Sequence, residues 1–85
     1  MNSDPKEELR RHVRGWLADR AALAFNTGSI QRGVSREISC TEPEVAAACD
    51  LLLDLGHLRE IPNTLGANRY FKIHAAGTLA HERGE

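Results

Sequence analysis

Residues 41 to 56 read Thr-Glu-Pro-Glu-Val-Ala-Ala-Ala-Cys-Asp-Leu-Leu-Leu-Asp-Leu-Gly, and this stretch carries signals for both ends of one helix. The Thr41 hydroxyl can accept the amide of Glu44, while the Glu44 carboxylate reaches back to the amide of Thr41, which is a capping box. Pro43 falls in the first turn, where a missing N–H costs nothing. Gly56 supplies the left-handed residue that ends a helix. The sequence therefore predicts a helix over residues 42 to about 55.

The two faces of this helix differ in character. Its apolar residues recur at helical spacing and predict a buried stripe made of Val45, Ala48, Cys49, Leu52 and Leu55. The opposite face carries Glu42, Glu44, Ala47, Asp50, Leu51 and Asp54. Cys49 is interpreted as a small buried apolar residue. Its spacing from Cys40 fits neither a zinc site nor a redox pair, so no metal is expected.

Two helices are predicted before this one. Asp4 and Pro5 mark the start of the first, over about residues 5 to 23, with a buried stripe of Leu9, Val13, Trp16 and Leu17. Its outer side bears Arg10, Arg11 and Arg14, interpreted as a solvated face, with phosphate contact as the alternative. A very short strand near residues 23 to 25 is compatible with the pattern. The second helix covers about residues 29 to 38, from the spacing of Ile30, Val34 and Ile38.

A hairpin is predicted after residue 56. Residues 57 to 61 and 69 to 73 alternate polar with apolar, and residues 62 to 68 are rich in turn formers. The hairpin therefore spans about residues 57 to 74. A closing turn or short helix can follow it, and a frayed tail is expected over residues 78 to 85 because of Gly77 and the charged end. We expect Val45, Cys49, Leu52, Leu58, Trp16 and Ile73 to meet in one core.

The composition and charge of the chain limit the classes of protein to which it can belong. The chain has 85 residues, 41% hydrophobic and 27% charged, which fits a single globular domain over residues 1 to 85. The net charge of −1 gives the whole molecule no long-range attraction for a polyanion. No apolar stretch is long enough for a membrane span, and residues 1 to 7 lack the pattern of a secretory signal. A cytoplasmic protein without membrane partners is expected.

This order of elements resembles the winged helix-turn-helix fold, an α+β fold of three helices with a two- or three-stranded antiparallel wing. The resemblance covers about residues 23 to 77. It rests on Thr41-x-x-Glu44-Val45, on Leu52-x-x-Leu55-Gly56-x-Leu58 and on Arg69-Tyr70-x-x-Ile73-x-x-x-Gly77. In that fold the third helix is the recognition helix and the hairpin loop is the wing.

A narrower resemblance joins Ile30-Gln31-Arg32-Gly33-Val34-Ser35 with Leu55-Gly56-His57-Leu58-Arg59 and Asn68-Arg69-Tyr70. These segments are similar to the C-terminal winged helix of primase/helicase-like proteins of phages and integrated elements. Members of that group tend to have tryptophan where this chain has Val34 and His57. The resemblance implies a part, or a stand-alone relative, of a replication protein.

No catalytic pattern accompanies these elements. The four histidines are scattered, without carboxylates or cysteines at ligand spacing, and no phosphate loop, nucleophile elbow or paired-carboxylate cluster is present. The sequence predicts a protein that is not an enzyme and needs no cofactor, metal or small-molecule substrate.

Two hypotheses for function follow. In the first, the chain binds double-stranded DNA, in transcription regulation or mobile-element replication, through cations and polar groups of helix two and the wing: Gln31, Arg32, Ser35, Arg36, Arg69 and Lys72. The third helix offers acids on its exposed side and no side chain suited to base edges, which weighs against this. In the second, the face of that helix formed by Ala47, Asp50, Leu51 and Asp54 docks a protein partner or a second copy of the chain.

Overall fold

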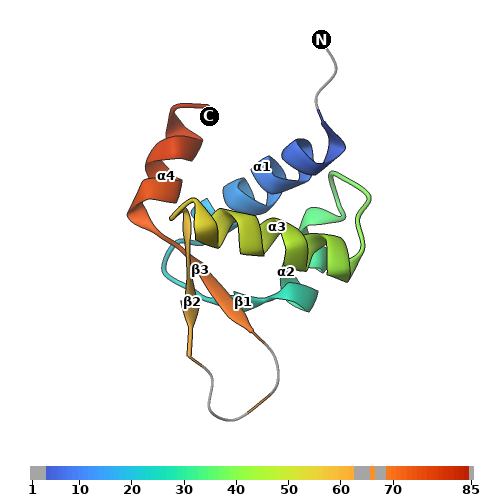
Figure 1. Cartoon of the computed structure of the whole chain (residues 1–85). Helices are drawn as coiled ribbons and strands as arrows, with labels where there is room; N and C mark the ends of the chain where they lie inside the picture. Colours follow the sequence, from blue (N-terminus) through green and yellow to red (C-terminus); the bar gives the residue numbers. More distant parts are fainter. Residues whose placement is uncertain (1–3, 63–65, 67–68, 85) are drawn as a thin grey trace.

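Four helices and a small sheet make up the fold, as seen in a computed structural model that describes residues 4–62, 66 and 69–84. The chain order is α1 (Pro5–Ala18), β1 (Phe25–Asn26), α2 (Thr27–Val34), α3 (Glu42–Asp54), β2 (Leu58–Ile61), β3 (Tyr70–Ile73) and α4 (Ala75–Glu82). The strands form an antiparallel sheet in the order β1-β3-β2, which lies below α1 and α3 in Figure 1. This is the predicted α+β winged helix-turn-helix fold. No helix within the described residues is long and apolar enough to cross a membrane.

Both ends of α3 are built as the sequence predicts. The Glu44 amide donates to the Thr41 hydroxyl at 3.3 Å, and the Thr41 amide donates to the Glu44 carboxylate at 2.9 Å. At the other end Gly56 has φ +77°, and the amides of Gly56 and His57 donate to the carbonyls of Leu53 and Leu52 at 3.0 and 2.9 Å. This pair of bonds is a Schellman motif, which satisfies carbonyls that the helix leaves open.

Replacing Thr41 with alanine is expected to lower the free energy of unfolding by about 0.5 to 2 kcal/mol, because the Glu44 amide loses its acceptor. Urea unfolding followed by circular dichroism measures the change. Thr41→Ser retains the hydroxyl and is the matched control, expected to stay close to wild type. An alanine variant with the wild-type midpoint would contradict the role assigned to this cap.

The predicted core is confirmed. Val45, Cys49, Leu52, Leu58 and Ile73 are buried in one cluster, and Trp16 packs against its edge, half-buried. Burial, and secondarily the carboxylate of Asp50, raises the pKa of Cys49 to about 12. The thiol therefore stays protonated and behaves as a small apolar group.

Two expectations about individual side chains are wrong. Leu55 is 56% exposed, because the chain turns out of α3 there. Arg14, expected on a solvated face, is buried.

The predicted helix bounds also need correction. The first helix ends at Ala18 rather than near residue 23, since the chain then turns so that Phe25 can pair with Phe71. The second helix spans residues 27–34 rather than 29–38. It starts early because Asn26 caps it by accepting the Ser29 amide at 2.8 Å, and residues 35–37 form a turn toward α3.

The tail expected to be frayed is helical as far as Glu82. The His74 side chain caps α4 by accepting the Ala76 amide, and Gly77 and Ala80 are buried as α4 packs on α1. Packing thus holds a segment whose composition alone suggests fraying. In the predicted hairpin, β2 and β3 pair from Leu58↔Ile73 to Ile61↔Tyr70. Residues 63–65, 67–68 and 85, including Asn68 of the narrower resemblance, lie outside the described residues.

Candidate nucleic-acid interface

Arg69, directly before β3 at the loop end of the hairpin, is paired with acids. Its guanidinium contacts Asp50 of α3 at 2.8 Å and the carboxylate of Glu60 on β2 at 2.9 Å. It also lies over the Phe71 ring, 5.0 Å from the ring centre. Its hydrogen bond lowers the pKa of Glu60, and both carboxylates raise the pKa of Arg69. Arg69 therefore fastens the hairpin to α3, and its charge is already matched by two carboxylates.

Lys72 lies on the other face of the sheet, beside a cation that the sequence analysis did not select. Leu58, Phe71 and Ile73 point into the core, so the alternating residues Arg59 and Lys72 point away from it. These two cations are direct cross-strand partners. Neither side chain makes an ion pair or hydrogen bond with any other described residue. Like charges directly opposite each other destabilise a sheet, so this pair is kept at a cost to folding.

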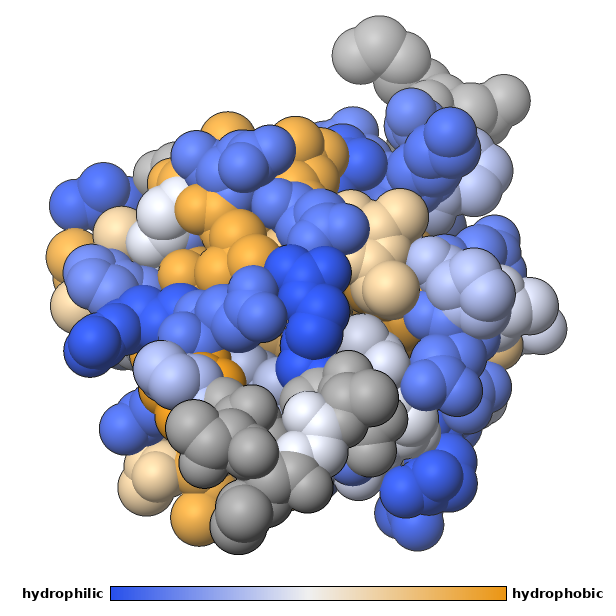
Figure 2. Space-filling view, turned by 60° about the horizontal axis from the view of Figure 1, so that its bottom comes forward, coloured by the Kyte–Doolittle hydropathy of each residue, from blue (hydrophilic) through white to orange (hydrophobic). Residues whose placement is uncertain are grey.

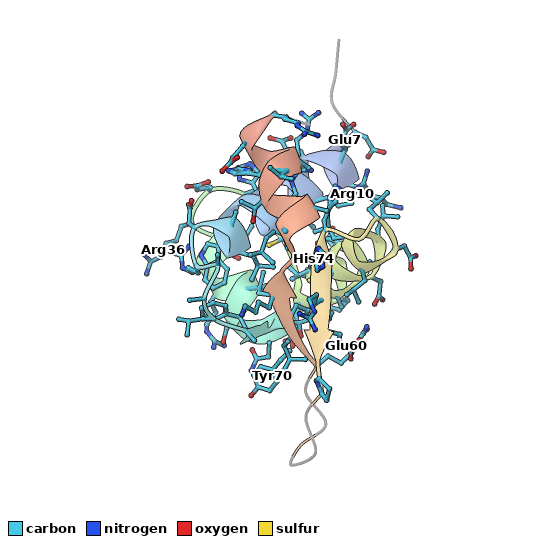
Figure 3. All side chains as sticks on the ribbon, turned by 90° about the vertical axis from the view of Figure 1, so that its left-hand side faces the viewer. Glu7, Arg10, Arg36, Glu60, Tyr70 and His74 are labelled. Carbon is cyan, nitrogen blue, oxygen red and sulfur yellow. The ribbon has the colours of Figure 1, made fainter. Side chains whose placement is uncertain are left out.

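Tyr70 extends the same outer face toward the hairpin tip. It pairs with Ile61 on one side and Asn26 on the other. Figure 3 shows Tyr70 and Arg36 on one side of the molecule and Glu60 on the other. The outer face of the sheet thus presents cations and an aromatic ring, while the face toward α3 presents acids.

The four predicted residues of helix two and the turn after it separate into two groups. Gln31 donates to the Ser35 hydroxyl at 2.9 Å and to the Cys40 carbonyl at 3.0 Å, so both side chains hold the turn between α2 and α3. Arg32 is exposed and folds back to the Ser29 hydroxyl at 3.3 Å. Arg36 is exposed and has no ion pair with another residue of the described segments.

The exposed face of α3 carries acidic side chains with apolar side chains between them. Its predicted docking residues, Ala47, Asp50, Leu51 and Asp54, are all exposed. Ala47 and Leu51 border a groove of about 540 Å³ that is also lined by Leu9 and Ile38. Figure 2 shows orange apolar patches set among blue polar side chains, and Leu51 and Leu55 are among the large apolar residues exposed to solvent.

The structure therefore divides the predicted DNA site. Arg32, Arg36 and Lys72 are exposed or half-buried cations without a carboxylate partner among the described residues, whereas Gln31, Ser35 and Arg69 have internal roles. Arg59 is the residue that sequence reasoning missed. The hairpin register would have revealed it, since pairing Leu58 with Ile73 places Arg59 opposite Lys72. In the same described part of the chain, no group of three His, Cys, Asp or Glu side chains is placed to hold a metal ion.

Comparison with known proteins gives a structural match alone. No family model and no curated protein sequence matches the chain. Among solved structures, the chain is similar to a transcriptional regulator from Clostridium thermocellum, with a TM-score of 0.78 and 12% sequence identity. The match covers 99% of this chain and 84% of that one. At this identity the likeness shows a shared fold.

Proposed function

We propose that the chain is a non-enzymatic DNA-binding module that holds duplex DNA through phosphate contacts. The Arg59–Lys72 pair carries the proposal. An exposed arginine beside a half-buried lysine, with no acid among the described residues to neutralise either, lowers stability unless an anionic partner is bound. Backbone phosphates are such a partner, and cations at this spacing can meet neighbouring phosphate oxygens.

Arg32 and Arg36 add cations from α2 and from the turn that follows it. Phosphate contacts position a protein on DNA without reading its sequence. The exposed side of α3 offers Asp50 and Asp54 and no arginine, lysine, asparagine or glutamine for base edges. The proposed binding is therefore weak, dependent on salt and largely independent of DNA sequence. The winged-helix fold, shared with a transcriptional regulator, supports a role in gene regulation.

The test is titration of the labelled protein with a generic DNA duplex at about 50 mM and about 200 mM salt. Removing both cations with Arg59→Ala and Lys72→Ala is expected to weaken binding at least about tenfold. It should also reduce the slope of log Kd against log salt by about two, one for each lost phosphate contact. The same double variant should melt no lower than wild type, because a repulsive cross-strand pair has been removed.

The matched control removes two cations elsewhere, with Lys6→Ala and Arg10→Ala on α1. Arg10 lies well away from Arg36 in Figure 3. This variant loses the same net charge and should bind DNA as tightly as wild type, apart from a small uniform effect of charge. Equal losses in the two double variants would show a nonspecific charge effect and would remove the basis of the proposal.

The second candidate function is protein docking through α3. The observation that favours it is the exposure of Leu51, at 38%, beside the groove and on the helix face that carries Asp50 and Asp54. Such a face suits a partner, or a second copy, with basic and apolar side chains. If no amide signal moves on DNA addition even at low salt, this candidate replaces the first. Leu51→Arg is then the variant to compare in sedimentation experiments.

The narrower sequence resemblance adds to the main proposal the process and the compartment in which the chain acts. A winged helix similar to those of primase/helicase-like proteins would act in the replication of a phage or integrated element, in the cytoplasm. This part rests on the sequence motifs alone.

A further inference from the structure

A cleft separate from the outer face of the sheet lies among the helices. It has a volume of about 580 Å³, within the usual range for small-molecule sites. The α1 helix contributes Gly15 and Trp16, α4 contributes His81, and α2 with the following turn contributes Gly33 and Arg36.

Two glycines shape this cleft. A Cβ atom on Gly33 would collide with the indole of Trp16, so the ring lies directly against α2. A Cβ atom on Gly15 would lie 2.8 Å from Cε1 of His81, so a side chain there would intrude between α1 and α4. The two glycines thus let the rings of Trp16 and His81 lie close against the helices that border the cleft.

A stacked guanidinium provides a flat surface at the cleft. The Cζ atom of Arg20 lies 4.2 Å from the ring centre of Trp16, and its Nη1 donates to the Trp16 carbonyl at 3.0 Å. The guanidinium thus lies over the indole, and Arg20 is exposed to solvent. Arginine planes held in this way stack well on planar rings such as nucleic-acid bases.

Cations beside this surface favour an anion. Arg11, Arg20 and Arg36 all line the cleft, together with His12 and His81. Arg11 is already paired with Glu7 at 3.0 Å, so Arg20 and Arg36 are the arginines that an anion can use. Of the two carboxylates in the lining, Glu37 is already engaged by His12, with Oε2 3.2 Å from Nδ1, and the other is Asp19. Arg36 keeps its full charge available, because it has no carboxylate partner within the described residues.

We propose that this cleft binds a nucleotide, with the base stacked on the Arg20–Trp16 pair and the phosphate held by Arg36. The ligand needs both a planar ring and a phosphate, because the flat surface of Arg20 on Trp16 and the cation of Arg36 line the same cleft. A free mononucleotide and an unpaired nucleotide of a DNA strand both provide it. The site goes beyond the proposed duplex binding, since it shares Arg36 with it but uses neither Arg59 nor Lys72.

The fluorescence of Trp16 tests this directly, because it is the only tryptophan in the chain. Adenosine monophosphate and a single-stranded deoxyadenosine hexanucleotide are titrated separately, with adenosine and inorganic phosphate as partial ligands. We expect saturable quenching by at least one of the two complete ligands. If the free nucleotide is the ligand, adenosine should bind at least about tenfold more weakly than adenosine monophosphate, because adenosine lacks the phosphate.

Variants locate the site. Arg36→Ala should weaken binding of the quenching ligand about tenfold without changing the melting temperature, since Arg36 is exposed. Arg20→Ala should also weaken binding of the quenching ligand about tenfold. It will in addition change the starting fluorescence of Trp16, because Arg20 lies over the ring. Lys6→Ala removes a cation outside the cleft and should have no effect. Tighter binding of the hexanucleotide than of the monophosphate would identify a DNA strand as the source, and the reverse a free nucleotide.

The proposal is overturned if neither complete ligand gives saturable quenching at concentrations up to about 10 mM, because a Kd above that value is too weak for useful recognition. It is also overturned if Arg36→Ala leaves the quenching unchanged. Duplex binding is measured independently through Arg59→Ala with Lys72→Ala, so failure of the cleft leaves the proposed function standing, and the reverse also holds.

Discussion

Leu52→Ala is expected to lower the free energy of unfolding by about 2 to 5 kcal/mol. Leu52 is 2% exposed and lies in the last turn of α3, within the same buried cluster as Val45, Leu58 and Phe71. Truncation loses the transfer free energy of the side chain and leaves a cavity that the helix and sheet can fill only in part. Urea denaturation with a fitted midpoint and slope measures the loss.

The same helix provides the control. Leu55→Ala makes the same chemical change three residues later, but Leu55 is 56% exposed, so its effect should stay within about 0.5 kcal/mol. Similar losses at both positions would mean that α3 is rotated from the orientation described. A wild-type midpoint for Leu52→Ala would mean that α3 is not buried at all.

Gly77→Ala is expected to destabilise the protein by about 1 to 3 kcal/mol, although alanine favours helices. A Cβ atom there would collide with the backbone carbonyl oxygen of His57. That oxygen also accepts the His74 amide at 2.9 Å, which ties the start of α4 to the segment before β2. Backbone atoms held in this way cannot move aside as a side chain can, so α4 must shift.

Gly15→Ala is the matched control for this substitution. The atom that its Cβ would meet belongs to the imidazole of His81, which can turn away. Alanine also gains about 0.8 to 1 kcal/mol of helix propensity over glycine. Thermal melts should therefore place Gly15→Ala at or above wild type and Gly77→Ala below it. The opposite order would contradict the packing of α4 described here.

Local chemistry made much of α3 and the hairpin predictable. A capping box, a left-handed glycine and alternating strands act over a few residues, so they can be recognised in the sequence and recur in the structure at Thr41, Glu44 and Gly56. The order of elements then led to the winged-helix fold. For the candidate site, the sequence selected Arg32, Arg36 and Lys72, and these remain in the proposal, although Arg36 lies in the turn after α2 and not on the helix.

The rest depended on contacts between segments that are distant in sequence. Arg69 looks like a free cation until the hairpin folds onto α3 and brings it to Asp50 and Glu60. Arg59 becomes notable only when strand register sets it opposite Lys72. The cleft between α1, α2 and α4 likewise needs all three helices in place. The sequence by itself determined where α1 and α3 begin and which residue types each element carries, because those signals are local. Tertiary structure decided which charges are neutralised and which remain available, because electrostatic pairing depends on distance in space.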